Sequence, residues 1–137
     1  MAITEDNEVI FVKQFRYPLN EMLIEVPGGF IDAGEQPMQG IERELLEETG
    51  YSFSSFHYLG ITAANPGVLN NYTYLFLALG GKKTANQSLD DNEEIEIILK
   101  PIEEAMAMLM HNEIKQSMHA LCMFYAFEFM KKNGLDQ

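Results

Sequence analysis

Hydrophobic and polar positions change their period several times along the chain, and each change predicts a different element. Runs of β-branched and aromatic residues, some alternating with polar ones, predict strands over 8–16, 22–30, 55–63, 71–79 and 94–99. Apolar residues at helical spacing predict helices over 37–48, 101–110 and 114–132. The turn signal at 5–7 places Ile3 in a preceding strand, so we expect the chain to begin within a hairpin.

Strands that come before, between and after helices are typical of layered folds. We therefore expect an α/β fold in which a mixed β-sheet is sandwiched between helices, an α/β/α arrangement. Two polar stretches, 65–71 and 80–94, are predicted as loops, and the second is predicted to be mobile. No repeat or interdomain linker interrupts the 137 residues, which predicts a single domain.

The charge of the chain limits its partners. Nine basic and twenty-one acidic residues give a net charge of −12. This disfavours nucleic acid and anionic membranes, because both need a basic face. A phosphorylated small molecule remains a suitable ligand if metal cations reverse the local charge. The apolar stretch at about 118–130 is too short to span a bilayer and no signal peptide is seen, so we expect a cytoplasmic protein.

The helix predicted over 37–48 concentrates acidic residues on one patch. Its core-facing stripe is expected to consist of Met38, Ile41 and Leu45. A second cluster, at i, i+3 and i+4 spacing, borders that stripe and consists of Glu44, Glu47 and Glu48. Acidic runs are usually solvated faces, but two of these residues lie in the last turn, where the helix dipole disfavours negative charge. A divalent cation is the simplest compensator, since Mg²⁺ prefers carboxylate, water and phosphate oxygens.

The full spacing of this segment resembles the Nudix box, whose pattern is GX5EX7REUXEEXGU. The matching residues are Gly29, Glu35, Arg43, Glu44, Leu45, Glu47, Glu48 and Gly50. The final position, normally aliphatic, holds Tyr51, a change that should affect packing more than chemistry. The resemblance implies that residues 1–137 form one Nudix hydrolase domain with the Nudix fold, short at its N-terminus.

In the Nudix family the acidic residues of the box bind Mg²⁺. The ligands implied by the resemblance are the carboxylates of Glu44, Glu47 and Glu48 and the carbonyl group of Gly28, with Mn²⁺ as an alternative ion. The resemblance also implies that Glu35 and Arg43 brace the loop against the helix. Bound cations would neutralise a diphosphate and position a water molecule for attack on phosphorus.

Other features resemble the ADP-ribose pyrophosphatase branch of this family. Pro66 lies sixteen residues after Gly50, and "QFR" and "IEVPGG" stand at 14–16 and 24–29. The substrate contacts implied are Arg16, Glu25, Gly29 and Pro66.

The acidic stretch "DDNEEIEI" at 90–97 resembles the late acidic loop of the same branch. This implies that Glu93 is a further metal ligand and Asp91 a candidate base, with Glu94 as a rival for the base. The catalytic residues implied are therefore Glu47, Glu44, Glu93 and Asp91. Without the box, the same run would be interpreted as a solvated loop.

These features favour a Mg²⁺-dependent hydrolase that cleaves ADP-ribose or a related nucleotide sugar into a nucleoside monophosphate and a sugar phosphate. Three alternatives stay open: a diphosphatase for a GDP- or UDP-linked sugar, a Nudix module that senses a nucleotide without turnover, and a structural domain. The sequence does not fix the natural substrate, the attacked phosphorus or the number of metals.

The predicted C-terminal helix is apolar on more than one face, which suggests a homodimer as well as a core. Cys122, the one cysteine, lies in that run and is expected in the core. His57, His111 and His119 lie on different elements without metal-ligand spacing, so we expect none to be catalytic.

Overall fold

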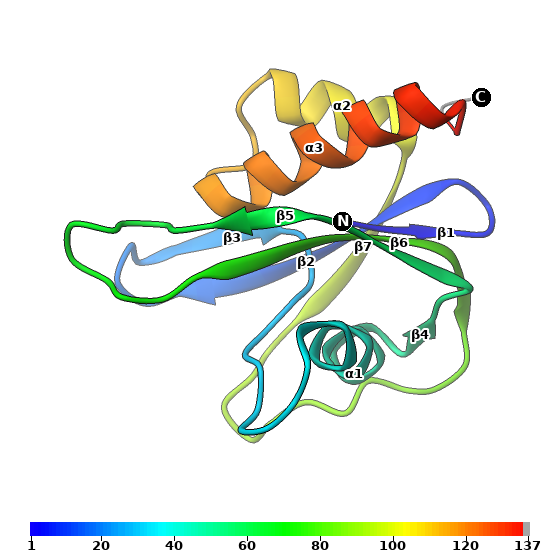
Figure 1. Cartoon of the computed structure of the whole chain (residues 1–137). Helices are drawn as coiled ribbons and strands as arrows, with labels where there is room; N and C mark the ends of the chain where they lie inside the picture. The colour runs from blue at the N-terminus through cyan, green and yellow to red at the C-terminus, as the bar shows by residue number, and fades with distance from the viewer. Residues whose placement is uncertain (136–137) are drawn as a thin grey trace.

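The computed structural model describes residues 1–135, in which a twisted mixed sheet lies between helices (Figure 1). The strands are β1 (Ala2–Thr4), β2 (Glu8–Arg16), β3 (Glu21–Glu25), β4 (Tyr51–Ser52), β5 (Ser55–Thr62), β6 (Thr73–Lys83) and β7 (Glu96–Pro101). The helices are α1 (Pro37–Thr49), α2 (Ile102–Met110) and α3 (Ser117–Asn133). Helix α1 covers one face of the sheet, and α2 and α3 cover the other (Figure 1). The expected α/β/α fold and the short first strand around Ile3 are confirmed.

Strand β2 organises one half of the sheet. It pairs antiparallel with β1, β3 and β7, with Val12 opposite Glu25 and Phe11 opposite Ile98. Strand β6 organises the other half, since it pairs parallel with β1 and antiparallel with β4 and β5. The short β1 therefore joins two strand groups that are distant in sequence.

The core has one part on each face of the sheet. Residues 9–12 of β2 are at most 1% exposed, because helices cover both faces there, which explains a continuous apolar run in place of alternation. Phe11 packs with Leu77, Met123 and Met130 on the side of α2 and α3. Ile10 packs with Leu45 and Ala78 on the side of α1. Cys122 is buried on the α3 side, as expected.

Several predicted boundaries are wrong. Strand β3 ends at Glu25, not at residue 30, and Pro27 follows within two residues without an N–H group for the ladder. Helix α3 begins at Ser117, not at 114, where the Gln116 side chain accepts a hydrogen bond from the Met118 N–H. On α1, Leu45 is buried, but Met38 is 38% exposed and does not belong to the core.

Residues 80–83, predicted as loop, continue β6, and β4 was not predicted. Here the glycines serve packing. A Cβ atom on Gly80 would lie 2.2 Å from Ser54 Oγ, and one on Gly81 would lie 2.6 Å from the Phe53 ring. The strand then pairs Lys82 with Ser52 in β4. Within residues 1–135 no helix is long and apolar enough to cross a membrane.

Candidate active site

The acidic helix is fixed at both ends by local sequence. At its start, the Gln36 N–H donates to Oε1 of Gln39, 3.1 Å away, and Pro37 occupies the first turn, where its missing N–H is not needed. At its end, Gly50 adopts a left-handed conformation with φ of 72° and donates its N–H to the Leu46 carbonyl. The box residues 35–48 are therefore held on the end of the loop before α1 and on α1 itself.

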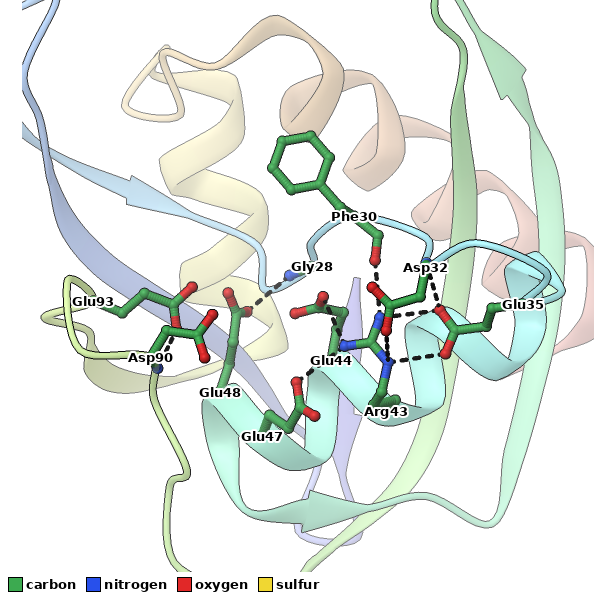
Figure 2. Close-up of polar contacts among 10 residues, drawn as sticks. All are labelled: Gly28, Phe30, Asp32, Glu35, Arg43, Glu44, Glu47, Glu48, Asp90 and Glu93. Carbon is green, nitrogen blue, oxygen red and sulfur yellow. Dashed lines mark hydrogen bonds and ion pairs between the residues drawn. The ribbon is translucent and has the colours of Figure 1, made fainter.

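Arg43 lies at the centre of the site and uses all three of its nitrogen atoms (Figure 2). Nε and Nη2 donate to the two oxygens of Glu35 at 2.8 and 3.0 Å. Nη1 donates to Glu44 Oε1 and Glu47 Oε2, both at 3.0 Å, and Nη2 also reaches the Phe30 carbonyl at 2.9 Å. This geometry agrees with the expected brace between the loop and the helix.

Glu35 is the structural acid of this group. Its side chain accepts from Arg43 and from the Asp32 N–H, which lies 3.0 Å from Oε1. These donors stabilise the ionised form, so they lower the pKa of Glu35 to about 2. Glu35 is therefore ionised at any physiological pH and fixed in position.

The pKa values of Glu44 and Glu48 are shifted in the opposite direction from that of Glu35. Burial raises the pKa of Glu48 to about 8, and the carboxylates of Glu44 and Glu93 add to the rise, although the Gly28 N–H donates to Glu48 Oε2 at 3.0 Å. Burial also raises the pKa of Glu44, against the effect of Arg43. Both residues belong to α1, yet the charge of Glu93, which lies 49 positions after Glu44 and 45 after Glu48, raises the pKa of each.

Gly29 allows these carboxylates to approach the backbone. A Cβ atom at this position would lie 2.3 Å from the carboxyl carbon of Glu44, whereas one at Gly28 would meet nothing closer than 4.0 Å. Of the two adjacent glycines, only Gly29 is therefore required for this close approach. The Gly28 N–H faces Glu48, and only its carbonyl group is free to serve as the expected ligand.

The segment after β6 brings Glu93 to the helix. Residues 83–88 cap four successive carbonyl groups at the end of α1, through the donors Lys83, Thr84, Ala85, Gln87 and Ser88. Gln87 Nε2, for example, donates to the Glu48 carbonyl at 2.8 Å and to the Ile95 carbonyl at 3.1 Å. Beyond this anchor, the Asp90 N–H donates to Glu93 Oε2 at 3.1 Å, and the Glu93 side chain faces Glu48 (Figure 2).

No ready-made ligand cluster of three His, Cys, Asp or Glu side chains exists among the described residues. The carboxylates instead accept from internal donors: Glu44 and Glu47 from Arg43, Glu48 from Gly28 and Glu93 from Asp90. The donor set nevertheless suits a hard divalent cation, because it offers several carboxylate oxygens and mutual repulsion that a cation would relieve.

Arg16 and Glu25 form a second network at the ends of β2 and β3. Arg16 Nε donates to Glu25 Oε1 at 2.8 Å and Nη2 to Oε2 at 2.6 Å, and Glu25 is only 1% exposed. The Glu25 hydrogen bonds raise the pKa of Arg16, and the Glu48 charge contributes, which places this pair beside the acidic cluster. The structure thus brings together Arg16, Glu25 and the box acids.

Other expected site residues are not joined to this cluster. Pro66 lies in the exposed loop between β5 and β6, where the Asn65 carbonyl accepts from the Val68 and Leu69 N–H groups in a local turn. Figure 1 shows this hairpin tip projecting away from α1. Asp91 and Glu94 are exposed on the loop that carries Glu93, and no hydrogen bond of the described chain orients either carboxylate.

Sequence reasoning missed two features of the site. The donors of residues 83–88 lie in a stretch predicted as mobile loop, and no local signal marks them as caps for a helix 40 residues earlier. His119, which is expected not to be catalytic, lies 3.6 Å from Glu25, measured from Nδ1 to Oε2, and this approach was not predicted. Only the tertiary packing of α3 reveals this approach.

Comparison with known proteins agrees with the geometry. A family model described as "NUDIX domain" matches residues 1–122. The chain is 32% identical over 126 residues to a methanol dehydrogenase activator of Bacillus methanolicus, covering 91% of this chain and 68% of that protein. It is 30% identical over 132 residues to the ADP-ribose pyrophosphatase of Bacillus subtilis (strain 168), covering 96% and 69%.

A solved structure, "Crystal structure of ADP compounds hydrolase", superposes with a TM-score of 0.87 at 19% identity, covering 98% of this chain and 71% of that one. At this identity the likeness shows the fold alone. The family match spans the box, the Arg16–Glu25 pair and the late acidic loop. The chain therefore belongs to the Nudix family of hydrolases.

Proposed function

We propose that this chain is a Mg²⁺-dependent hydrolase that cleaves the diphosphate of ADP-ribose, or of a related nucleotide sugar, into a nucleoside monophosphate and a sugar phosphate. One observation carries the proposal: acids from two distant segments, Glu44 and Glu48 from α1 and Glu93 from the late loop, are coupled beside a partly exposed arginine. A site that combines acids and a cation suits a metal-bound diphosphate.

The residues that would hold the ion are Glu44, Glu47, Glu48 and Glu93 and the carbonyl group of Gly28. When bound, Mg²⁺ would supply positive charge to the diphosphate and to the leaving phosphate. Mn²⁺ prefers the same oxygen ligands and is an alternative. The hydrogen bonds that Glu48 and Glu93 accept from the Gly28 and Asp90 N–H groups would break in part when the ion binds. Arg43 would keep Glu44 and Glu47 aligned through Nη1.

The remaining roles fall to the chain itself. Arg16 would bind a phosphate oxygen through Nη1, which makes no hydrogen bond within residues 1–135. Glu25 would orient that guanidinium before the ligand binds, and Gly29 would keep the loop close to Glu44. Asp91 would accept the proton of the attacking water, with Glu94 as the rival base, since both side chains are exposed and unengaged. Pro66 would shape the far wall of the substrate site when the β5–β6 loop contacts the ligand.

The direct test is incubation of the pure protein with ADP-ribose and Mg²⁺, followed by measurement of AMP. We expect AMP from the wild-type protein and about 100-fold less from a Glu47→Gln variant, in line with loss of one charged group at a metal centre. Product analysis in ¹⁸O-labelled water would identify the attacked phosphorus. An equal, background level of AMP from both proteins would reject hydrolysis of ADP-ribose.

Further measurements distinguish this function from the alternatives, which are another nucleotide-sugar substrate, a sensing module and a structural domain. A panel of ADP-, GDP- and UDP-sugars ranked by kcat/KM distinguishes the preferred substrate from its rivals. Tight binding of a nucleotide sugar without turnover would indicate a sensing module, and absence of Mg²⁺ binding in calorimetry would indicate a structural domain. The homodimer and the cytoplasmic location stay predictions, and light scattering after gel filtration would test the first.

A further inference from the structure

Three donors converge on the buried carboxylate of Glu25. Arg16 makes the two short hydrogen bonds described above, and Gln14 Nε2 lies 3.4 Å from Oε2. The third, Nδ1 of His119, approaches the same Oε2 atom from the first turn of α3, at 3.6 Å. Glu25 itself is 1% exposed, so its carboxylate depends on Arg16 and Gln14 for hydrogen bonds and not on water.

The His119 Nδ1 atom is buried and has no hydrogen-bond partner within residues 1–135. A separation of 3.6 Å is too long for a hydrogen bond, so this polar atom bears a desolvation cost in the ligand-free state. Burial also lowers the pKa of His119 to about 4, so its imidazole is neutral at pH 7 and carries one N–H. With that N–H on Nδ1, the imidazole faces the Glu25 carboxylate without bonding to it, and a small movement would complete the contact.

The partner most able to leave Glu25 is Arg16. Its side chain is 43% exposed, it is the last residue of β2, and its Nη1 atom is free of hydrogen bonds in the described chain. If Arg16 turns to a diphosphate, Glu25 loses two charge-assisted hydrogen bonds. A buried carboxylate left in this way is strongly destabilising unless another donor replaces the arginine.

Resting on the proposed function, we propose that His119 is a positioning residue that takes over the Glu25 carboxylate when Arg16 turns to the diphosphate of the substrate. Shortening the Nδ1–Oε2 distance by less than 1 Å, from 3.6 Å, satisfies the orphaned His119 atom and the abandoned carboxylate at once. The exchange also connects α3 on one side of the sheet to substrate binding beside α1. The charged groups that act on the imidazole are Glu25 of β3, Arg16 of β2 and the α-amino group of Met1 before β1.

The first experiment follows the imidazole signals of His119 by NMR over a pH series. Adding Mg²⁺ and the non-hydrolysable α,β-methylene analogue of ADP-ribose should raise the pKa of His119 toward its ordinary value, because the positive charge of Arg16 moves away and the bond to Glu25 forms. The signals of His57, which stacks on Phe129 away from Glu25, serve as an internal control. A His119 titration that is unchanged at saturating analogue would overturn the inference.

A ligand-free arm separates this inference from the proposed function. The Arg16→Met substitution removes the competing donor, so it should raise the pKa of His119 in the same direction without any nucleotide. If no nucleotide sugar binds or is cleaved, the proposed function fails, while this arm still decides whether His119 takes over Glu25. An unchanged His119 titration in the Arg16→Met variant would overturn the takeover.

The second experiment compares variants at the position. His119→Leu should raise KM about tenfold and leave kcat within about threefold, because the missing donor weakens every ligand-bound state equally. His119→Gln, which keeps an N–H donor, should restore most of the affinity, and His57→Leu should leave KM unchanged. A wild-type KM in His119→Leu would overturn the proposal. If His119→Leu does not fold, the NMR titrations decide.

Discussion

Arg43 and Arg16 each hold a glutamate beside the same acidic cluster, but the two networks are built differently. Arg43 spends all three nitrogen atoms on protein acceptors, namely three carboxylates and the Phe30 carbonyl. Arg16 spends only Nε and Nη2, both on Glu25, and leaves Nη1 without a partner in the described chain. The first arginine is saturated and shapes the site, whereas the second keeps a donor for a ligand.

The two glutamates that these arginines hold, Glu35 and Glu25, also differ in burial and in their other donors. Glu35 is only partly buried, with 15% of its side chain exposed, and its position depends on Arg43 and on the Asp32 N–H. Glu25 is buried, and Gln14 and His119 stand near it as further donors. The Arg16 pair can therefore open while Gln14 still donates to Glu25, whereas opening the Arg43 network leaves Glu44 and Glu47 without a donor in the described chain. The comparison indicates that an arginine within the box motif can serve to hold the site together and need not bind the substrate.

The largest effect is expected from Arg43→Met. This change frees Glu35, Glu44 and Glu47 from their common donor, so kcat/KM should fall roughly 100-fold or more through misplaced ligands, and the Tm should fall as well. Arg43→Lys should recover only part of the activity, because an ammonium group cannot replace the guanidinium fork. Steady-state kinetics and thermal unfolding measure both. Wild-type kinetics in Arg43→Met would place Arg43 outside the site.

A smaller and differently divided effect is expected from Arg16→Met. Loss of a charge-assisted bond to the diphosphate should raise KM roughly tenfold or more, with a lesser change in kcat. The unfolding free energy should fall by about 2 kcal/mol, since Glu25 keeps only weaker donors. In the double variant Arg16→Met/Glu25→Leu, the stability should return while KM stays high. If both the unfolding free energy and KM returned to wild-type values, the Arg16–Glu25 pair would have a structural role only, like the Arg43 network.

The contrast between adjacent glycines gives the next prediction. Gly29→Ala places a methyl group against the Glu44 carboxylate, whereas Gly28→Ala meets only Ile41 at 4.0 Å. We expect the concentration of Mg²⁺ for half-maximal activity to rise about tenfold in Gly29→Ala. The added methyl group pushes the Glu44 carboxylate out of position, and the hydrogen bond from Arg43 limits how far that carboxylate can move. Gly28→Ala is the matched control and should shift it much less. Equal behaviour of the two variants would contradict this account of the loop.

The last prediction leaves activity aside and concerns the pH dependence of stability without divalent cations. Glu48 has a native pKa of about 8, above its ordinary 4.5, so its contribution is fully present below pH 4.5 and is lost as the pH rises through 8. The unfolding free energy should fall over that window by no more than about 1.4 kcal/mol per pH unit. Glu35 has the opposite sign, because its lowered pKa gives stability that is lost only as the pH falls from 4.5 toward 2.

Chemical denaturation at a series of pH values with a chelator would measure this slope. Glu48→Gln should flatten it between pH 5 and 8, and Glu35→Gln should not. A stability that rises with pH across this window in the chelated wild-type protein would show that Glu48 is not held as the structure describes.

The box and most of the strands could be predicted from the sequence because their signals are local. The acids of α1 meet at i, i+3 and i+4 spacing, and the alternating or continuous apolar runs identify β2, β5, β6 and β7. The boundaries at Gly80 and Gly81 could not be predicted, because these residues look like a turn, yet their missing side chains make room for Phe53 and Ser54. Contacts such as His119 with Glu25 depend on the docking of α3, for which no local pattern exists.

The capping of α1 by residues 83–88 has a consequence for how the molecule opens. The carbonyl groups of Glu47, Glu48, Thr49 and Gly50 are each bound by this one segment. Fraying of the helix end and release of the segment are therefore one cooperative event, since neither backbone can lose its partner alone. Local unfolding should then separate the end of α1 and the segment that leads to Glu93 at the same time, and refolding should restore both in a single step.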